Sequence, residues 1–300
     1  MATGKTGGRA LAALVVLTLL WGYTWVIAKQ ALAYAGPFQV GVLRTAVATV
    51  VLFATLIATR RPLRLTAPWR TACVGIFQTG GFIALSTWAL VEGGAGKTAV
   101  LIFTMPIWTL LLARLVLGEH IRATQWAAAA CALAGLVLII APWKFHAGLF
   151  SKLLAVLAAM SWALSTILVK RWRAVLAADV LALTTWQMAF GLLPLVAIAL
   201  LVPERPTQWT PDFLAIIGFM AVVSTALGWF LWLYVLERLP AWQASLSILG
   251  IPAVASLSSR WQLGERMAAS ELAGMLLIGL GLTTISLLNW RSQRRLRGAR

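Results

Sequence analysis

The chain has 300 residues, of which 61% are hydrophobic and 11% charged, and its mean hydropathy is +0.89. A chain this apolar cannot cover itself with polar side chains in water, which excludes a soluble globular protein and indicates an all-α polytopic membrane protein. The formal net charge of +17 could suggest nucleic-acid binding. The basic residues, however, gather at the ends of apolar segments, so we expect no nucleic-acid partner and a surface that faces the lipid bilayer.

Ten apolar segments are each long enough to cross about 30 Å of hydrocarbon at about 1.5 Å per residue. In chain order they cover residues 9–34, 37–59, 69–91, 98–117, 124–142, 149–169, 180–202, 213–236, 243–263 and 269–290. The loops between them are short, so the sequence predicts ten transmembrane helices and no soluble domain. The first segment is too long for a removable signal peptide, and we expect it to remain as the first span.

The two halves of the chain carry similar motifs in the same order. The repeat-equivalent pairs are Trp21 with Trp162, Lys29 with Lys170, Pro106 with Pro252, Glu119 with Glu265 and Gly135 with Gly281. Five spans in each half is an odd number, so the second copy must lie inverted relative to the first. The sequence therefore predicts two inverted five-helix repeats over residues 1–143 and 149–290, followed by a basic tail over 291–300.

Lysine and arginine are distributed unevenly between the two sides of this topology. Of the 25 basic residues, seventeen fall on the side that holds both chain ends and seven on the other, while Arg44 lies inside the second segment. An excess of basic residues marks the cytoplasmic side of a membrane. We therefore expect both termini in the cytoplasm, with the basic tail held against anionic headgroups.

The titratable residues do not form a catalytic cluster in the sequence. All eight acidic residues fall in loops or at segment ends, and the two histidines fall in loops on opposite sides of the membrane. A membrane enzyme would need His, Asp, Glu or Cys gathered at one depth. Cys73 and Cys131 are interpreted as packing residues. We therefore expect no catalytic residue, no metal site, no cofactor and no enzymatic activity.

Several of the sixteen tryptophans lie deep inside the predicted spans rather than at the headgroup boundary. In the first span a tryptophan face comprises Trp21, Thr24, Trp25 and Ala28, and the equivalent face of the sixth comprises Trp162, Ser165, Thr166 and Val169. Equivalent faces of inverted repeats meet near the membrane midplane, where such transporters bind substrate. Packing between helices or contact with lipid is the competing interpretation of each tryptophan.

Six residues are candidates for a substrate cavity with apolar walls and a few polar contacts. The walls would be Trp25, Phe103 and Trp162, and the polar contacts Gln78, Ser165 and Ser245. A side-chain amide in hydrocarbon needs a partner or a wet cavity, whereas a serine can equally bond its own helix. Pro106 and Pro252 are predicted to bend the fourth and ninth spans and to act as hinges, although simple accommodation of packing would also explain them.

The chain carries a specific pattern of motifs. The first span has an early Trp-Gly followed by a lysine, the fourth and ninth spans each contain a proline, and Leu-Gly-Glu closes those same two spans. In this pattern it resembles the bacterial EamA-type branch of the drug/metabolite transporter superfamily, over essentially its whole length. It is most similar to the aromatic amino acid exporters of the bacterial inner membrane. The resemblance implies a ten-helix fold with a central cavity and a small-molecule substrate, and we expect a monomer.

The function implied by the resemblance is export of aromatic amino acids, or of similar small apolar metabolites, by alternating access. A proton-coupled carrier needs a titrating group in the substrate pathway, and the sequence places no Asp, Glu or His in the middle of a span. We therefore expect a uniporter. The alternative is a broad-specificity drug/metabolite exporter coupled to protons, which should carry a membrane-embedded carboxylate for its cationic substrates.

Overall fold

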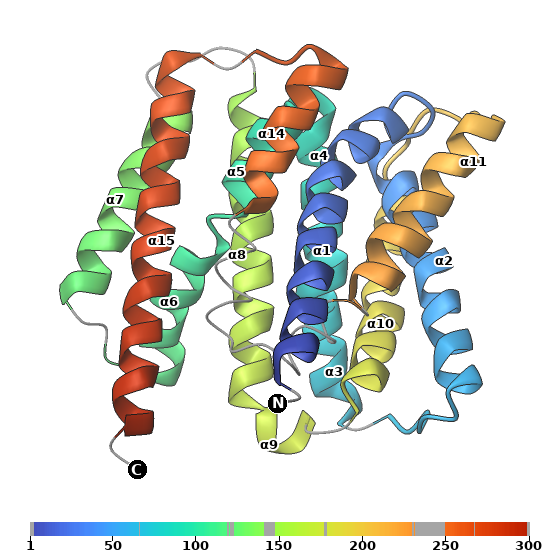
Figure 1. Cartoon of the computed structure of the whole chain (residues 1–300). Helices are drawn as coiled ribbons and strands as arrows, with labels where there is room; N and C mark the ends of the chain where they lie inside the picture. Colours follow the sequence, from blue (N-terminus) through green and yellow to red (C-terminus); the bar gives the residue numbers. More distant parts are fainter. Residues whose placement is uncertain are drawn as a thin grey trace.

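The computed structural model describes residues 3–65, 67–118, 120, 123–140, 148–176, 179–229, 231, 250–266 and 268–298, and within them every regular element is a helix (Figure 1). The first half contains α1 (Thr3–Ala31), α2 (Pro37–Ala58), α3 (Pro68–Gly75), η1 (Ile76–Gly81), α4 (Phe82–Glu92), α5 (Ala95–Ile102), α6 (Met105–Leu117) and α7 (Ala123–Ile140). The second half contains α8 (Leu149–Arg171), α9 (Arg173–Leu176), α10 (Val180–Leu201), α11 (Pro211–Gly218), η2 (Phe219–Leu227), α14 (Gly250–Leu263) and α15 (Ala269–Gly298).

Each of the ten predicted segments is mostly helical over the part of it that the structure describes. Among the described residues, six helical stretches are long and apolar enough to cross a membrane, and three further apolar helices are shorter. The N-terminal end of α1 and the C-terminal end of α15 lie at the same end of the bundle (Figure 1). The α15 helix runs on through residue 298, so most of the predicted basic tail continues the last span.

Two π-helical segments interrupt the third and eighth predicted spans. The first, η1, joins α3 to α4, and the second, η2, follows α11. Their first residues, Ile76 and Phe219, are 143 residues apart, close to the spacing of the sequence repeat. A π-helical turn is rare and occurs mostly at functional sites, and both segments contribute side chains to the cavity described below.

The fourth span is broken where Pro106 was predicted to bend it. Helix α5 ends at Ile102, and α6 starts at Met105 with the proline in its first turn. Because proline has no N–H, the carbonyl four residues earlier loses its helical partner. Thr104 stabilises the break, since its hydroxyl donates to the Leu101 carbonyl at 2.6 Å. The equivalent stretch before Gly250 lies outside the described residues, so a bend at Pro252 stays a prediction.

A carboxylate from the second half caps a helix of the first. Glu265, beyond the end of α14, accepts hydrogen bonds from the backbone nitrogens of Ala95 at 2.7 Å and Gly96 at 3.3 Å. These are unpaired donors at the positive end of α5. A Cβ on Gly94 would lie 2.7 Å from a carboxylate oxygen, so glycine is needed there for the close approach. Glu119, its repeat equivalent, lies outside the described residues.

A second glutamate caps the start of α2 in the same way. Glu204, beyond the end of α10, accepts from the backbone nitrogens of Phe38 and Gln39, each at 2.8 Å. A Cβ on the preceding Gly36 would overlap its carboxylate. The two glutamates thus satisfy helix ends that would otherwise expose unpaired donors near the membrane.

Helices α7 and α15 lie side by side at one edge of the bundle and pack through glycines (Figure 1). A Cβ on Gly135 would lie 2.4 Å from a backbone oxygen of α15, and one on Gly281 would lie 2.6 Å from a backbone oxygen of α7. The residues that form this interface are repeat equivalents, 146 positions apart in the sequence. They are Gly135 and Gly281, Ala128 and Gly274, and Ala132 and Ile278. Each helix therefore presents the same surface to the other, as in an interface with two-fold symmetry.

Candidate functional site

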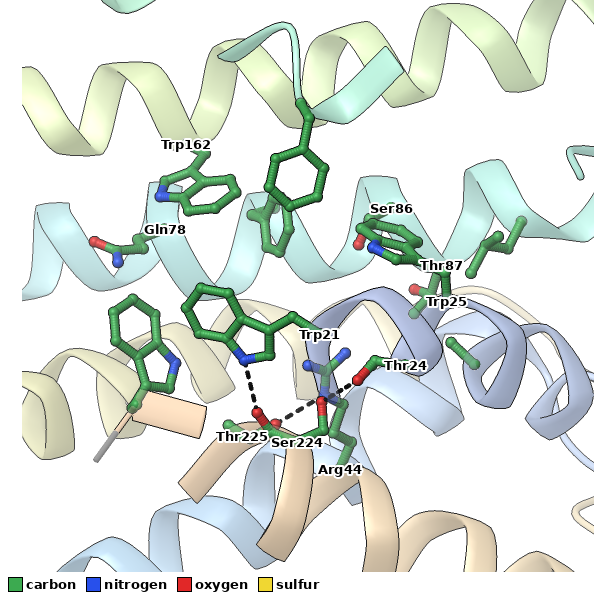
Figure 2. Close-up of a pocket in the computed structure, with 15 residues that line it drawn as sticks. Trp21, Thr24, Trp25, Arg44, Gln78, Ser86, Thr87, Trp162, Ser224 and Thr225 are labelled. Atoms are coloured by element: carbon green, nitrogen blue, oxygen red, sulfur yellow. Dashed lines mark hydrogen bonds between the residues drawn. The ribbon is translucent and has the colours of Figure 1, made fainter. Parts of the chain in front are cut away.

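A cavity of about 100 Å³ lies between the two halves of the chain. It exceeds the roughly 10–15 Å³ that one water requires, so it can hold a small solute. Its walls come from α1, α2, η1, α4, α8 and η2, together with Phe103 in the break between α5 and α6 and Trp229 just beyond η2 (Figure 2). The lining residues are Trp21, Thr24, Trp25, Ala28, Arg44, Gln78, Phe82, Ser86, Thr87, Leu90, Phe103, Trp162, Ser224, Thr225 and Trp229.

One side of the cavity is an aromatic cluster centred on Trp162 of α8. The ring centroid of Trp162 lies 5.2 Å from that of Phe82 in α4 and 6.0 Å from that of Phe103. The inclined rings have the geometry that aromatic pairs prefer. A second pair, Trp21 with Trp229 at 5.8 Å, adds to the apolar wall. The cavity therefore offers ring faces and edges to a flat apolar group.

The side of the cavity between α1 and η2 carries a hydrogen-bond network. Trp21 Nε1 donates to the Ser224 carbonyl at 3.0 Å, and the hydroxyls of Thr24 and Ser224 lie 2.6 Å apart. Thr24 also donates its hydroxyl hydrogen to the Leu20 carbonyl at 2.6 Å. Since a threonine hydroxyl has one hydrogen, Ser224 is the donor in the bond between the two hydroxyls.

Arg44 brings a positive charge to the same region. It projects from α2, is half-buried, and donates from Nε to Thr225 Oγ1 at 3.0 Å (Figure 2). Thr225 in turn donates to the Met220 carbonyl at 2.8 Å, five residues back along η2. The π-helical turn thereby fixes the hydroxyl that orients the guanidinium. Arg44 is the ionisable side chain among the described lining residues.

Four of the six predicted site residues lie together in this cavity, and their role in binding stays a prediction. These four are Trp25, Gln78, Phe103 and Trp162. Ser165 does not line the cavity: it is fully buried and donates to the carbonyl of Trp162 at 2.7 Å within its own helix. That is the competing use of a helical serine. Ser245 lies outside the described residues.

The sequence did not point to several polar residues that line the cavity. These are Ser86 and Thr87 of α4 and Ser224 and Thr225 of η2. Hydroxyl residues in apolar helices commonly bond their own backbone, so their type and spacing give no signal of a cavity. For Arg44 the signal was present, since a charge inside a span marks function, but its partner is 181 residues away.

Neither acid–base nor metal chemistry is supported by the described lining. None of the described lining residues is Asp, Glu, His or Cys, and the described parts of the chain hold no group of three metal-binding side chains. Cys73 and Cys131 are free and half-buried. The arrangement can enclose and orient a small molecule.

The amino-acid sequence is similar to those of several transporters. The chain is 25% identical to an uncharacterized transporter, YoaV, of Bacillus subtilis, covering 91% of this chain and 95% of that protein. It is 29% identical to a probable amino-acid metabolite efflux pump of Salmonella typhimurium (91% and 92% covered) and 27% identical to a probable terminal-alkyne amino-acid exporter of Streptantibioticus cattleyicolor (97% of each).

A solved crystal structure shares the fold, with a TM-score of 0.65, 19% sequence identity and coverage of 94% of this chain and 98% of the other. The sequence profile of the EamA-like transporter family matches the chain twice, over residues 8–141 and 149–287. The two profile matches confirm the resemblance seen in the motifs and show a membrane transporter. The chain belongs to the EamA-like transporter family.

Proposed function

We propose that this protein exports aromatic amino acids, or similar small apolar metabolites, across the bacterial inner membrane by alternating access. The observation that carries the proposal is the cavity between the halves, which joins the aromatic cluster around Trp162 to polar groups around Arg44. An aromatic amino acid has the same division into a ring and a charged end. Two relatives named for amino-acid efflux or export support the substrate class.

The proposed architecture is two inverted five-helix repeats over residues 1–143 and 149–290, with the tail over 291–300 and both termini in the cytoplasm. Three features support the repeats: the reciprocal glycine contacts of α7 and α15, the π-helical segments at matching positions, and the two matches to one family. A single chain encloses the cavity, which supports a monomer as the working unit.

Alternating access requires one half to move against the other. The break at Pro106 lies next to Phe103 in the cavity wall, so a change of angle there would move an aromatic group that touches the substrate. We infer a hinge at Pro106 and a matching one at Pro252. In this mechanism the halves rock about the cavity and open it to one side at a time.

The transport mode we propose is uniport. Arginine stays protonated throughout the physiological range, so Arg44 is a fixed charge and cannot carry a proton through a cycle. Export would follow from the accumulation of the amino acid inside the cell. A broad drug exporter coupled to protons is the alternative, but a fixed positive charge in the cavity disfavours cationic substrates.

Purified protein in proteoliposomes tests the proposal with a panel of labelled phenylalanine, tyrosine, tryptophan, leucine and a hydrophobic cation. We expect saturable transport of the aromatic amino acids, acceleration by unlabelled substrate on the opposite side, and no accumulation when only a pH gradient is imposed. Transport of the cation with proton-driven accumulation would establish the alternative instead.

A further inference from the structure

Lys29 and Arg44 lie within the first and second predicted spans, and the structure gives them different surroundings. Lys29 Nζ lies 2.5, 3.0 and 3.1 Å from the carbonyl oxygens of Leu90, Val91 and Gly93. An ammonium group has three N–H donors, so these three bonds use all of them. The acceptors lie at the negative end of α4. Lys29 is therefore fully engaged in holding a helix end.

Arg44 has donors to spare. A guanidinium has five N–H donors, and the bond from Nε to Thr225 uses one. In the part of the chain that the structure describes, the terminal nitrogens of Arg44 have no hydrogen-bond partner and no carboxylate pairs with it. Figure 2 shows the side chain reaching from α2 with its terminal nitrogens directed into the pocket.

A bound anion would stabilise a guanidinium in this position. A positive charge removed from bulk water and left without a counter-ion is destabilising, and the penalty falls when an anion binds beside it. The planar fork of arginine matches the two oxygens of a carboxylate. The Thr225 hydroxyl fixes Nε, so the remaining donors are already oriented toward the cavity.

We propose that Arg44 binds the carboxylate of the transported solute, and this inference rests on the proposed function. The hydroxyls of Thr24 and Ser224 lie on the same side of the cavity (Figure 2), but each already donates its one hydrogen within the protein, so Arg44 supplies the donors to the carboxylate. The side chain of the solute then points across the cavity to Trp162 and the phenylalanines in contact with it. The substrate class narrows to solutes with a carboxylate at one end and a flat apolar group at the other.

Competition against labelled phenylalanine in proteoliposomes tests this assignment. Phenylalanine and 3-phenylpropionate carry the carboxylate, whereas phenylalanine amide has a neutral group in its place. Wild-type protein should bind the two carboxylates more tightly than the amide. Arg44→Gln should weaken carboxylate binding about tenfold to hundredfold, the range for hydrogen bonds to a charged group, and leave amide binding unchanged. Arg44→Lys keeps the charge but loses the planar fork, so its affinity for the carboxylates should lie between those of wild-type protein and Arg44→Gln.

The control is Arg64→Gln, which removes an arginine exposed outside the helices and should bind like wild type. Gel filtration and thermal unfolding would establish that each variant is folded. If Arg44→Gln is folded and loses carboxylate and amide binding equally, or loses neither, Arg44 does not bind the carboxylate.

A second readout separates this inference from the proposed function. Thermal stabilisation of the purified protein by each compound needs no transport. Suppose that wild-type protein transports no aromatic amino acid, that the carboxylates raise its melting temperature, and that they do not raise the melting temperature of Arg44→Gln. The assignment of Arg44 as the carboxylate site is then correct, and the proposed export of aromatic amino acids is wrong. If wild-type protein transports phenylalanine and Arg44→Gln keeps the same preference for the carboxylate, the proposed function stands and this inference is wrong.

Discussion

Replacing Trp162 by alanine removes the centre of the aromatic cluster. Its indole contacts the rings of Phe82 and Phe103, yet the side chain is only half-buried because one part faces the cavity. The substitution therefore acts on substrate binding as well as on stability. Burial of an aromatic ring contributes about 1.5–3 kcal/mol, and each aromatic pair adds about 0.5–1.5 kcal/mol.

If the substrate ring loses the whole burial term, binding weakens about tenfold to more than hundredfold. Proteoliposome transport of phenylalanine, measured over a range of concentrations, should show this as a raised half-saturation concentration. A substrate with a smaller side chain, such as alanine, makes less contact with the indole and should be affected less. Trp162→Phe keeps a ring at the position and should recover part of the affinity.

Trp261→Ala is the matched control, because that indole projects from α14 and is 85% exposed. Its loss removes the same side chain from the outer surface and should leave the half-saturation concentration unchanged. Equal effects of Trp162→Ala and Trp261→Ala, per folded molecule, would refute the assignment of Trp162 to the substrate cavity.

Three further substitutions test what holds the helices in place. Glu265→Gln should lower the free energy of unfolding by about 1–3 kcal/mol, because charge-assisted hydrogen bonds at the start of α5 are lost. Glu92→Gln, at an exposed position, is the control and should not lower it. Equal melting temperatures for the two variants would contradict the capping role of Glu265. Gly135→Ala should separate α7 from α15 and reduce the yield of folded protein, whereas Gly279→Ala in open space should be harmless; a normal yield of Gly135→Ala would oppose close packing there. Lys29→Met should lower the melting temperature without changing which solutes compete, and an altered preference would instead place Lys29 in the site.

The spans could be predicted from the sequence because the requirement for them is local. A run of about twenty apolar residues satisfies its backbone only as a helix in hydrocarbon. The break before Pro106 was predictable for the same reason, since proline removes a specific hydrogen bond wherever it occurs. The π-helical form of residues 76–81 and 219–227 was not predictable, because it depends on how the neighbouring helices pack against those turns.

The site was only partly predictable, since it depends on contacts between distant segments. Repetition of the tryptophan pattern placed Trp25 and Trp162 on faces that could meet, and both line the cavity. Ser165 follows the same pattern but bonds its own helix, a choice that spacing cannot reveal. The pairing of Arg44 with Thr225 joins α2 to η2, and the sequence of either segment alone does not indicate it.

The contacts around the cavity suggest how substrate and motion are linked. Arg44 bonds Thr225, Trp21 bonds Ser224, and Trp162 packs on rings of the other half, so each of these contacts joins one half to the other. In the proposed mechanism, the groups that meet the substrate are therefore the same groups that hold the halves together. A carboxylate at Arg44 adds bonds on the first half, and a ring against Trp162 adds contact on the second. The bound solute thus bridges the two bodies that must move, and solutes lacking either end should bind without driving the change as effectively.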